Sequence, residues 1–394
     1  MSVSHKVKEH MERSSWIRKM FEQGLELKNK FGADKVFDFS LGNPNLEPPE
    51  KVKQAIFEVM EDQRPGKHAY MPNAGLKETR EAVANFLSKE HGLKVLWDHI
   101  VMTCGAGGGL NVALKTLLDP GDEVIVLKPY FVEYLFYVDN HNGYGKLIST
   151  NEDFSLNIEA IEVGIKPRTK AIIINSPNNP SGRVYDEASL NSLGKILLEK
   201  REQYARPAYL LSDEPYSKLV YDGVKVPSIF RAYPYSLLIT SYSKDLSLPG
   251  ERIGFVAVNP QMTNWREMVD GLTFSNRILG FVNAPALMQR IIPQLQGITV
   301  DVLAYKKKRD LLCRGLSEAG YSFVKPEGAF YLFPKSPIAD DVLFVQELLK
   351  ENILAVPGAG FGTPGYFRLA YCVEDRIIEG SMAGFRRAIK KYSS

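Results

Sequence analysis

The sequence is poor in cysteine and histidine, and neither residue type occurs in a pattern that indicates a disulfide or metal framework. Its three cysteines, Cys104, Cys313 and Cys372, are odd in number and far apart, which argues against a disulfide framework and favours a reducing compartment. The six histidines form no His-x-x-x-His pair, and no Cys-x-x-Cys motif occurs. A metal site therefore has little support.

The chain also lacks an excess of charge and any long apolar segment. It carries 49 lysines and arginines against 46 aspartates and glutamates, and the net charge of +3 is too small to predict nucleic acid or an anionic membrane as a partner. No apolar run approaches the length of a membrane span, and the first residues have no apolar core of the kind found in signal peptides. We therefore expect a cytoplasmic protein that binds neither nucleic acid nor membrane.

What the chain does have is length and a set of short apolar runs. With 394 residues, 44% of them hydrophobic, it can bury a large core and form two domains. From residue 100 onward, apolar runs alternate with helical stretches. These runs are Ile100–Met102, Val124–Leu127, Ala171–Ile174, Tyr209–Leu211 and Leu237–Ile239. Continuous apolar strands separated by helices predict a mostly parallel sheet with helices on both faces, a three-layer α/β/α arrangement.

One further apolar run, Phe255–Val258, predicts an exception within this sheet. The segment that separates it from Ile239 is short and contains glycine and proline, so it barely has room for a helical crossover. We therefore expect this strand to run antiparallel to its neighbours.

The last third of the chain predicts a second, smaller α+β domain. From about residue 285 the pattern becomes helical, and it returns to strands at Gly328–Phe333 and Phe367–Ala370. Residues 3–30 resemble one amphipathic helix. We predict a large domain over residues 46–285 and a small domain formed by residues 286–394 together with an N-terminal arm, residues 1–45.

The stretch from Ser241 to Gly254 carries the strongest chemical signal. It places Lys244 between two serines and Arg252 inside a Gly-x-Arg-x-Gly run, with apolar strands on both sides. Burial disfavours an ammonium and lowers the pKa of a lysine, as a Schiff-base lysine requires. The arginine and the serine hydroxyls suit a phosphate. Our hypothesis is a lysine bound covalently to pyridoxal 5'-phosphate.

The residues after the first two strands fit that cofactor but have plainer explanations. Ligands bind beyond the carboxyl ends of the strands of an open parallel sheet. Gly105, Ala106 and Gly107 open a helical pattern, so their amides would face a phosphate, and a tight strand-to-helix turn explains them equally well. Phe131 could stack on a flat ring, although such an aromatic is more often part of a core.

The next two strand ends add polar groups for the same ring. Asn179 could donate to a phenolate oxygen, although its Asn-Pro context favours a turn. Asp213 could pair with a pyridinium N–H and keep the ring an electron sink, although a helix N-cap is the more common use of such a residue. Each plain explanation is reasonable alone, but all of them would have to hold at successive strand ends for the site to be absent.

Taken together, these motifs resemble those of one enzyme family over nearly the whole chain. They are Asn179-Pro180-Ser181-Gly182, Asp213-Glu214-Pro215-Tyr216, Ser241-x-Ser243-Lys244 and Gly250-x-Arg252-x-Gly254. In this order and spacing they resemble the fold-type I pyridoxal-phosphate enzymes, in the class I/II aminotransferase family that includes aspartate aminotransferase. The resemblance implies a mostly parallel seven-stranded sheet with one antiparallel strand, flanked by helices, and a smaller α+β domain.

The resemblance also implies roles for residues around the cofactor ring. Lys244 would form the Schiff base and then carry the proton between the substrate Cα and C4′ of the cofactor. Asp213 would pair with the pyridine nitrogen, and Phe131 would stack on the ring. Asn179 and Tyr216 would hold the ring phenolate oxygen. The catalytic set is therefore Lys244, Asp213 and Tyr216.

Further roles are implied for the phosphate and the substrate. Ser241, Arg252 and the amides of Gly105, Ala106 and Gly107 would bind the phosphate. Tyr70 would reach the phosphate of the neighbouring subunit, which implies a homodimer with shared sites. Gly42, Asn179 and Arg368 would hold the substrate carboxylate, because a planar guanidinium fork suits that group.

Two positions depart from the family pattern and leave the substrate side chain open. The family's usual cations for a second substrate carboxylate align with Gly107 and Gly271. Arg18 or Arg277 could substitute for them, or the substrate could be neutral or aromatic. Trp16 and Ile17 lie where family members close a helix over the substrate, so an apolar lid is a further hypothesis, and we assign Ile17 and Arg18 to the substrate side.

The predicted function is therefore an aminotransferase that moves the amino group of an L-amino acid to a 2-oxo acid in two half-reactions. A C–S β-lyase on the same scaffold is the alternative, because the fold alone does not choose the reaction. A non-catalytic cofactor-binding regulator is disfavoured, since the catalytic match fills the chain and no basic helix-turn-helix pattern is present.

Overall fold

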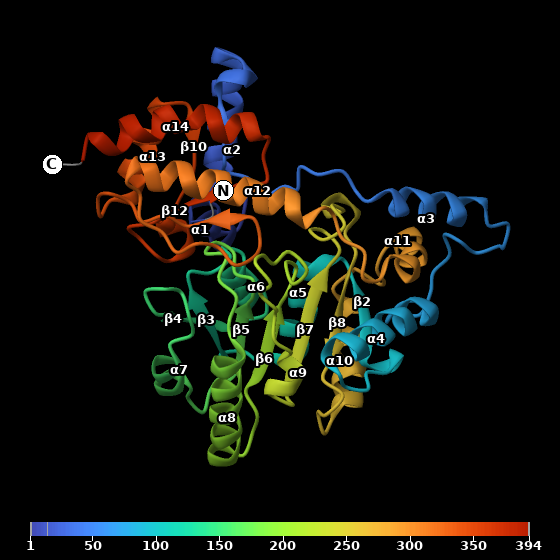
Figure 1. The fold of residues 1–394 in the computed structure, drawn as a ribbon. Coiled ribbons are helices and arrows are strands. Elements are labelled where there is room, and N and C mark those ends of the chain that lie inside the picture. Colours follow the sequence, from blue (N-terminus) through green and yellow to red (C-terminus); the bar gives the residue numbers. More distant parts are fainter. Residues whose placement is uncertain (1, 14, 393–394) are drawn as a thin grey trace.

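The central sheet forms the middle layer of the larger part of the molecule. The computed structural model describes residues 2–13 and 15–392, with the backbone alone at 12, 13, 15–19 and 21. The sheet has seven strands in the order β2–β8–β7–β6–β5–β3–β4 (Figure 1). The strands are β2 (Ile100–Thr103), β3 (Glu123–Lys128), β4 (Tyr144–Ser149), β5 (Thr169–Asn175), β6 (Tyr209–Asp213), β7 (Ser236–Ser241) and β8 (Gly254–Val258).

Strand β8 is the antiparallel member, as predicted. It pairs antiparallel with β2 on one side and β7 on the other, while the remaining neighbours pair in parallel. Gly254 lies opposite both Thr103 and Ser241. The first residue of β8 therefore sits beside the last residues of its two neighbours, at the carboxyl edge of the sheet.

The sequence did not reveal β4, which lies at the far edge of the sheet. An edge strand is covered less completely than a central one, and only Ile148 of this strand is buried. Its residues also include a glycine and a lysine, so no continuous apolar run marks it.

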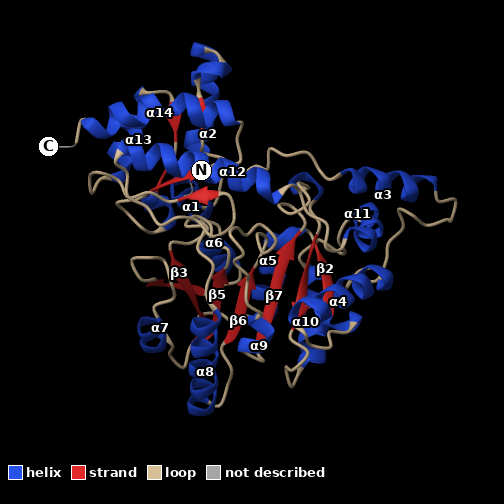
Figure 2. Ribbon diagram, in the orientation of Figure 1, coloured by secondary structure: helices blue, strands red, loops and turns tan. Residues whose placement is uncertain are grey.

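Helices cover both faces of the sheet, which confirms the three-layer prediction (Figure 2). One face is covered by α4 (Lys77–His91), α7 (Ile158–Gly164), α8 (Glu187–Tyr204) and α9 (Ile229–Ala232), and the other by α5 (Gly105–Leu117), α6 (Tyr134–Asn140) and α10 (Trp265–Ile278). Each face of the sheet has its own apolar cluster beneath these helices. Adjacent strand residues point to opposite faces, so Leu210 packs in the first cluster, under α4, α7, α8 and α9, and Leu211 packs in the second, under α5, α6 and α10.

The smaller part of the molecule brings the two ends of the chain together. Met20, Phe39, Phe344, Ile353 and Phe385 share one apolar cluster. The cluster lies among α2 (Ser15–Phe31), α12 (Val302–Ala319), α13 (Asp341–Lys350), α14 (Asp375–Lys390) and short strands. The strands are β1 (Phe37–Asp38) with β10 (Ile353–Leu354), and β9 (Tyr331–Leu332) with β11 (Val356–Pro357) and β12 (Phe367–Ala370).

The N-terminal segment is helical on both sides of residue 14, which lies outside the described residues. Its two described helices are α1 (His5–Arg13) and α2. Lys6 and His10 of α1 contact Asp139 at the end of α6, at 2.7 Å and 3.1 Å. Helix α1 is therefore tied to the large domain, while α2 contributes Met20 to the core of the small one.

The domain boundary predicted at residue 285 stays a prediction. Helix α3 (Glu50–Glu61) packs against α11 (Ala286–Ile291), and Met288 and Leu295 belong to the first sheet-face cluster. Val300 belongs to the small-domain cluster. From this packing we propose that the chain changes domain between Leu295 and Val300.

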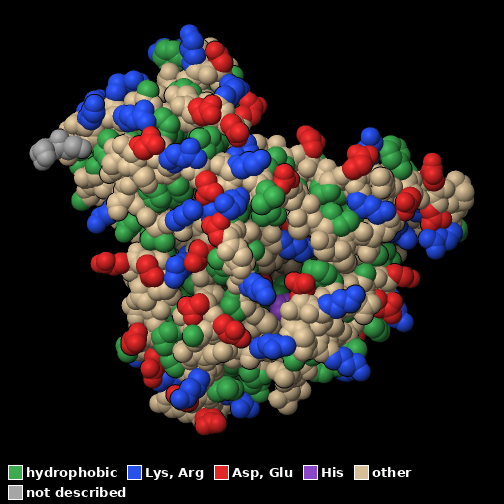
Figure 3. Space-filling model, viewed as in Figure 1, with side chains coloured by type: hydrophobic (Ala, Val, Ile, Leu, Met, Phe, Trp, Pro, Cys, Tyr) green, Lys and Arg blue, Asp and Glu red, His purple; other side chains and the backbone are tan. Residues whose placement is uncertain are grey.

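The visible surface carries basic and acidic side chains interspersed over both domains (Figure 3). Within the ranges that the structure describes, no helix is both long and apolar enough to cross a membrane.

The contact between α8 and α9 gives a test of the packing. A Cβ added to Gly194 would lie 1.9 Å from the carbonyl oxygen of Ala232. We expect Gly194→Ala to lower the free energy of unfolding by about 2 kcal/mol, because backbone must move to admit the methyl group. Gly250→Ala is the matched control, since a Cβ there meets no atom within 4 Å and the expected change is below about 0.5 kcal/mol. Equal stability of both variants in urea unfolding would contradict this account of the helix contact.

Candidate active site

The carboxyl ends of the central strands and the small domain enclose a cavity of about 300 Å³. Most of the residues predicted from the sequence line it. They are Gly42, Ala106, Gly107, Phe131, Asn179, Asp213, Tyr216, Ser241, Lys244, Arg252 and Arg368. Because each strand ends at the same edge of the sheet, one or two side chains from each loop converge here.

Two predicted residues, Gly105 and Tyr70, do not line this cavity, and two more lie where the structure describes no side chain. Gly105 lies just beneath it, since a Cβ there would be 2.8 Å from Nη2 of Arg252. Tyr70 is 89% exposed on the surface. Ile17 and Arg18 belong to α2, and their side chains, like that of Trp16, lie outside the described residues.

Lys244 lies partly buried in the loop after β7, with its amine in the cavity. The amine donates a hydrogen bond to the carbonyl oxygen of Gly42 at 3.0 Å and lies 5.5 Å from the ring centre of Phe330. Removal from water, and to a smaller extent the positive charges of Arg252 and Arg368, lower the pKa of Lys244 to about 8. A larger fraction of this amine than of a surface lysine is therefore neutral and nucleophilic near neutral pH.

Asp213 is the last residue of β6 and is buried. Its Oδ2 accepts a hydrogen bond of 2.5 Å from the hydroxyl of Tyr134 on α6, and the amide of Asn175 holds its backbone carbonyl at 2.8 Å. Its Oδ1 is buried without a partner among the described residues. Burial raises the pKa of Asp213 to about 7, against the opposing effect of the Tyr134 hydrogen bond. A carboxylate oxygen left unpaired in a cavity is suited to a cationic N–H of a ligand.

Arg368 lines the same cavity and has one buried side-chain donor without a partner among the described residues. It is 2% exposed and lies between the rings of Tyr331 and Phe361, at 4.8 Å and 4.9 Å. Its Nη1 donates to Oδ1 of Asn179 at 3.1 Å and its Nη2 to the carbonyl of Ser40 at 2.6 Å, while its Nε is buried without a partner in the described chain. A fixed guanidinium with a free donor suits a carboxylate.

Gly42 occupies its position because no larger residue fits there. A Cβ on Gly42 would lie 1.9 Å from the hydroxyl of Tyr331, which itself lies 3.0 Å from the hydroxyl of Tyr216. In the structure Tyr216 thus pairs with another phenol, and Asn179 pairs with Arg368. Both side chains still line the cavity.

The remaining wall is suited to an anion. The N-terminus of α5 opens into the cavity through Ala106 and Gly107, next to Ser241 and Arg252. Arg252 has a left-handed backbone, with φ of 51°, and its Nη1 donates to the carbonyl of Pro249 at 2.9 Å. Helix amides, a hydroxyl and a guanidinium are groups that suit a phosphate.

Sequence reasoning missed Asn175, Tyr134, Tyr137 and Tyr331 around this cavity. Asn175 could have been found, because it ends β5 just as Asp213 ends β6. Tyr134 and Tyr137 lie on a short helix behind the loop that carries Phe131, and nothing in their sequence context marks them as polar contacts. Tyr331 lay inside a predicted strand, but the pattern did not say that its hydroxyl faces the site.

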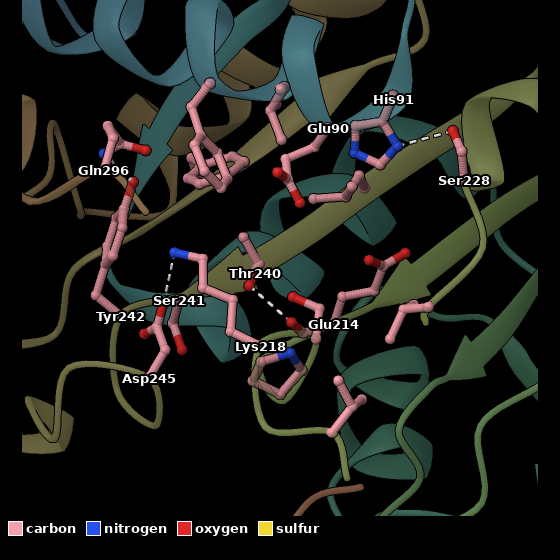
Figure 4. A pocket seen from close by; sticks show the side chains of 18 of the residues that line it. Glu90, His91, Glu214, Lys218, Ser228, Thr240, Ser241, Tyr242, Asp245 and Gln296 are labelled. Atoms are coloured by element: carbon pink, nitrogen blue, oxygen red, sulfur yellow. Dashed lines mark hydrogen bonds and ion pairs between the residues drawn. The ribbon is translucent and has the colours of Figure 1, made fainter. Parts of the chain in front are cut away.

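A second cavity, of about 450 Å³, lies next to the first and shares Pro215 and Ser241 with it. Figure 4 shows Lys218 extended toward Asp245, with which it forms an ion pair at 2.9 Å, and Thr240 donating to the carbonyl of Glu214 at 2.9 Å. The backbone carbonyl of Asp245 also accepts a hydrogen bond from Val300, at 2.7 Å. These contacts hold Asp245, the residue that follows Lys244, in place on the side of the second cavity.

Comparisons with known proteins agree with this arrangement. The family model for aminotransferase class I and II matches residues 34–379. A probable aspartate/prephenate aminotransferase of Thermus aquaticus is 35% identical over 93% of this chain and 94% of its own length. A probable aspartate aminotransferase of Methanocaldococcus jannaschii is 32% identical over 88% of this chain and 91% of its own.

Solved structures of such enzymes share the whole fold. An amino transferase from Eubacterium rectale superposes with a TM-score of 0.97 at 39% identity, covering 100% of both chains. Aspartate aminotransferase from Thermus thermophilus with maleate gives a TM-score of 0.84 at 30% identity, covering 95% of this chain and 96% of that one. The chain therefore belongs to the class I and II aminotransferase family and is a transaminase of the fold-type I, aspartate-aminotransferase-like group.

Proposed function

We propose that this transaminase uses pyridoxal 5'-phosphate, held on Lys244, to move the amino group of an L-amino acid to a 2-oxo acid. The observation that carries the proposal is one cavity that contains a lysine of lowered pKa and the unpaired Oδ1 of buried Asp213. The anion-binding wall around Arg252 and the N-terminus of α5 completes a set of contacts that fits the amine, ring and phosphate positions of that cofactor.

The chain's own groups divide the chemistry between them. When bound, the cofactor supplies an electron sink for the substrate α-carbon. The Asp213 carboxylate would accept a hydrogen bond from the ring N–H and stabilise the positive charge of the ring. Tyr134 keeps this carboxylate in place. Lys244 takes the proton from the substrate Cα and returns it at C4′. A base whose pKa is about 8 can both accept and release a proton near neutral pH.

Arg368 and Gly42 orient the substrate in this proposal. The free Nε of Arg368 donates to the α-carboxylate, and Asn179 holds the guanidinium in the required orientation. The glycine at position 42 lets the backbone approach the substrate where Tyr331 leaves no room for a side chain. The substrate contacts of Ile17 and Arg18 stay predictions.

We also propose a cytoplasmic homodimer in which Tyr70 reaches the cofactor phosphate of the partner. The 89% exposure of Tyr70 supports this assignment, because an aromatic side chain so exposed gains little from its own chain. Phe274 and Ile278 of α10 are also about half exposed, at 53% and 47%.

The reaction itself is tested by mixing the cofactor-loaded enzyme with single amino acids in the absence of a 2-oxo acid. We expect stoichiometric loss of the visible cofactor band with one 2-oxo acid formed per site, and no loss in Lys244→Ala. Steady release of pyruvate and ammonia without a 2-oxo acid acceptor would instead support a β-lyase and contradict the proposal.

The lowered pKa of Lys244 predicts a pH dependence. Below about pH 8 the amine is mostly protonated and cannot attack an aldehyde, so covalent capture of pyridoxal should accelerate as the pH rises through about 8 and level off above it. Pyridoxal is used because it lacks the ionising phosphate, and Lys244→Met should abolish the visible band. A midpoint near that of ordinary lysines, about 10.4, would show that the cavity does not lower the pKa of Lys244.

The shared site predicts complementation between two defective chains. Lys244→Ala lacks the amine, and Tyr70→Ala lacks the contact made across the dimer. After the two are mixed, unfolded and refolded together, mixed dimers should carry one complete site each, and activity should return to about a quarter of the wild-type value. Activity no higher than the mean of the two parents would place Tyr70 in its own subunit's site or outside both.

A further inference from the structure

Tyr137 on α6 lines the active-site cavity beside its anion-binding wall, which is formed by the N-terminus of α5, Ser241 and Arg252. A Cβ added to Gly107 would lie 3.0 Å from the hydroxyl oxygen of Tyr137 and 3.7 Å from its Cζ. The phenol therefore occupies the space into which a side chain at position 107 would extend. It lines the same cavity as Ser241 and Arg252, and its hydroxyl lies beside the N-terminal turn of α5.

This wall is short of side-chain donors. Residues 105–107 supply backbone amides only, and Cys104 at the N-cap of α5 makes no side-chain cap. The hydroxyl of Thr103 is used by the carbonyl of Gly105, to which it donates at 3.0 Å. The helix amides, Ser241 and Arg252 do not fill all the acceptor sites of a phosphate. A further donor at this edge would therefore form an additional hydrogen bond.

The Tyr137 hydroxyl is able to fill that role. Burial, followed by the negative charges of Glu133 and Asp213, raises the pKa of Tyr137, so the phenol keeps its proton near neutral pH. No hydrogen bond joins its hydroxyl to another residue in the described part of the chain. Tyr134, one turn earlier on α6, has its hydroxyl engaged by Asp213.

Helix α6 is fixed at both ends, which places Tyr137 reproducibly. Tyr134 is tied to Asp213 near its first turn, and Asp139 at its last turn pairs with Lys6 and His10 of α1. A donor on an anchored element loses little freedom when it binds, so its hydrogen bond contributes more to affinity.

We propose that Tyr137 donates a hydrogen bond to the phosphate group of the bound cofactor and supplies the hydroxyl that the Gly105–Gly107 turn lacks. This assignment rests on the proposed function, because it requires a phosphorylated cofactor in the cavity. It adds a contact from the enzyme's own chain to the phosphate site.

The test compares cofactors with and without phosphate. Dissociation constants of pyridoxal 5'-phosphate and of pyridoxal are measured by absorbance titration of cofactor-free wild type, Tyr137→Phe and Tyr134→Phe. We expect Tyr137→Phe to weaken the phosphorylated cofactor about tenfold and leave pyridoxal unchanged, since a hydrogen bond to a charged acceptor is lost. Tyr134→Phe is the matched control on the same helix and should weaken both compounds by the same factor, because it acts through Asp213.

Competition by inorganic phosphate gives a second readout that needs no catalysis. Phosphate should slow capture of pyridoxal 5'-phosphate by the wild type, and Tyr137→Phe should require about ten times more phosphate for the same effect. Equal weakening of both cofactors in Tyr137→Phe would show a merely structural role. Unchanged cofactor affinity with a raised KM for the amino acid would place the hydroxyl on the substrate and overturn the proposal.

The outcomes separate this inference from the proposed function. If the wild type captures neither cofactor form on Lys244, the proposed function fails. If the wild type captures both and Tyr137→Phe behaves like the wild type, only the role of Tyr137 fails. Thermal unfolding of the cofactor-free variants, with Tyr137→Leu as a second substitution, shows whether a loss of affinity arises from a loss of fold.

Discussion

The site depends on keeping the Lys244 amine partly out of water in a cavity that it shares with Arg252 and Arg368. Desolvation and two neighbouring guanidinium groups all oppose a third positive charge, and the amine responds with a pKa near 8. The buried carboxyl of Asp213 has the opposite shift, because its negative charge is also costly there. Before a ligand binds, burial thus disfavours the charged forms of Lys244 and Asp213, while the two arginines keep a fixed positive charge for anionic ligands. Phosphates and carboxylates meet that condition.

The sheet positions these groups through close backbone contacts at its edge. A Cβ on Gly254 would lie 2.4 Å from the carbonyl oxygen of Thr240 and 2.9 Å from the carbonyl carbon of Gly105. Only glycine lets the start of β8, the end of β7 and the first turn of α5 approach so closely. Gly105 itself has a φ of +72°, which favours glycine. These contacts bring Ser241 and the helix amides to one wall.

The order of apolar runs in the sequence predicted the sheet, its antiparallel strand and the residues at most strand ends, because buried strands and the loops after them leave local patterns. The predictions failed where no such pattern exists. Strand β4 is an exposed edge strand without an apolar run. Tyr134, Tyr137 and Tyr331 reach the site only through tertiary packing, so their neighbours in sequence do not distinguish them from core aromatics. Neither glycine that aligns with the family's usual cations has open space for a side chain. A Cβ on Gly107 would lie 3.0 Å from the hydroxyl of Tyr137, and a Cβ on Gly271 would lie 2.8 Å from Thr116.

The two backbone contacts around Lys244 have a mechanical consequence. Its amine rests on the carbonyl of Gly42, just after β1, and the carbonyl of the next residue, Asp245, is bonded to Val300, just before α12. Both partners adjoin elements of the small domain, whereas Lys244 follows a strand of the large one. The loop that carries Lys244 is therefore tied to segments of the small domain on both sides of the reacting amine.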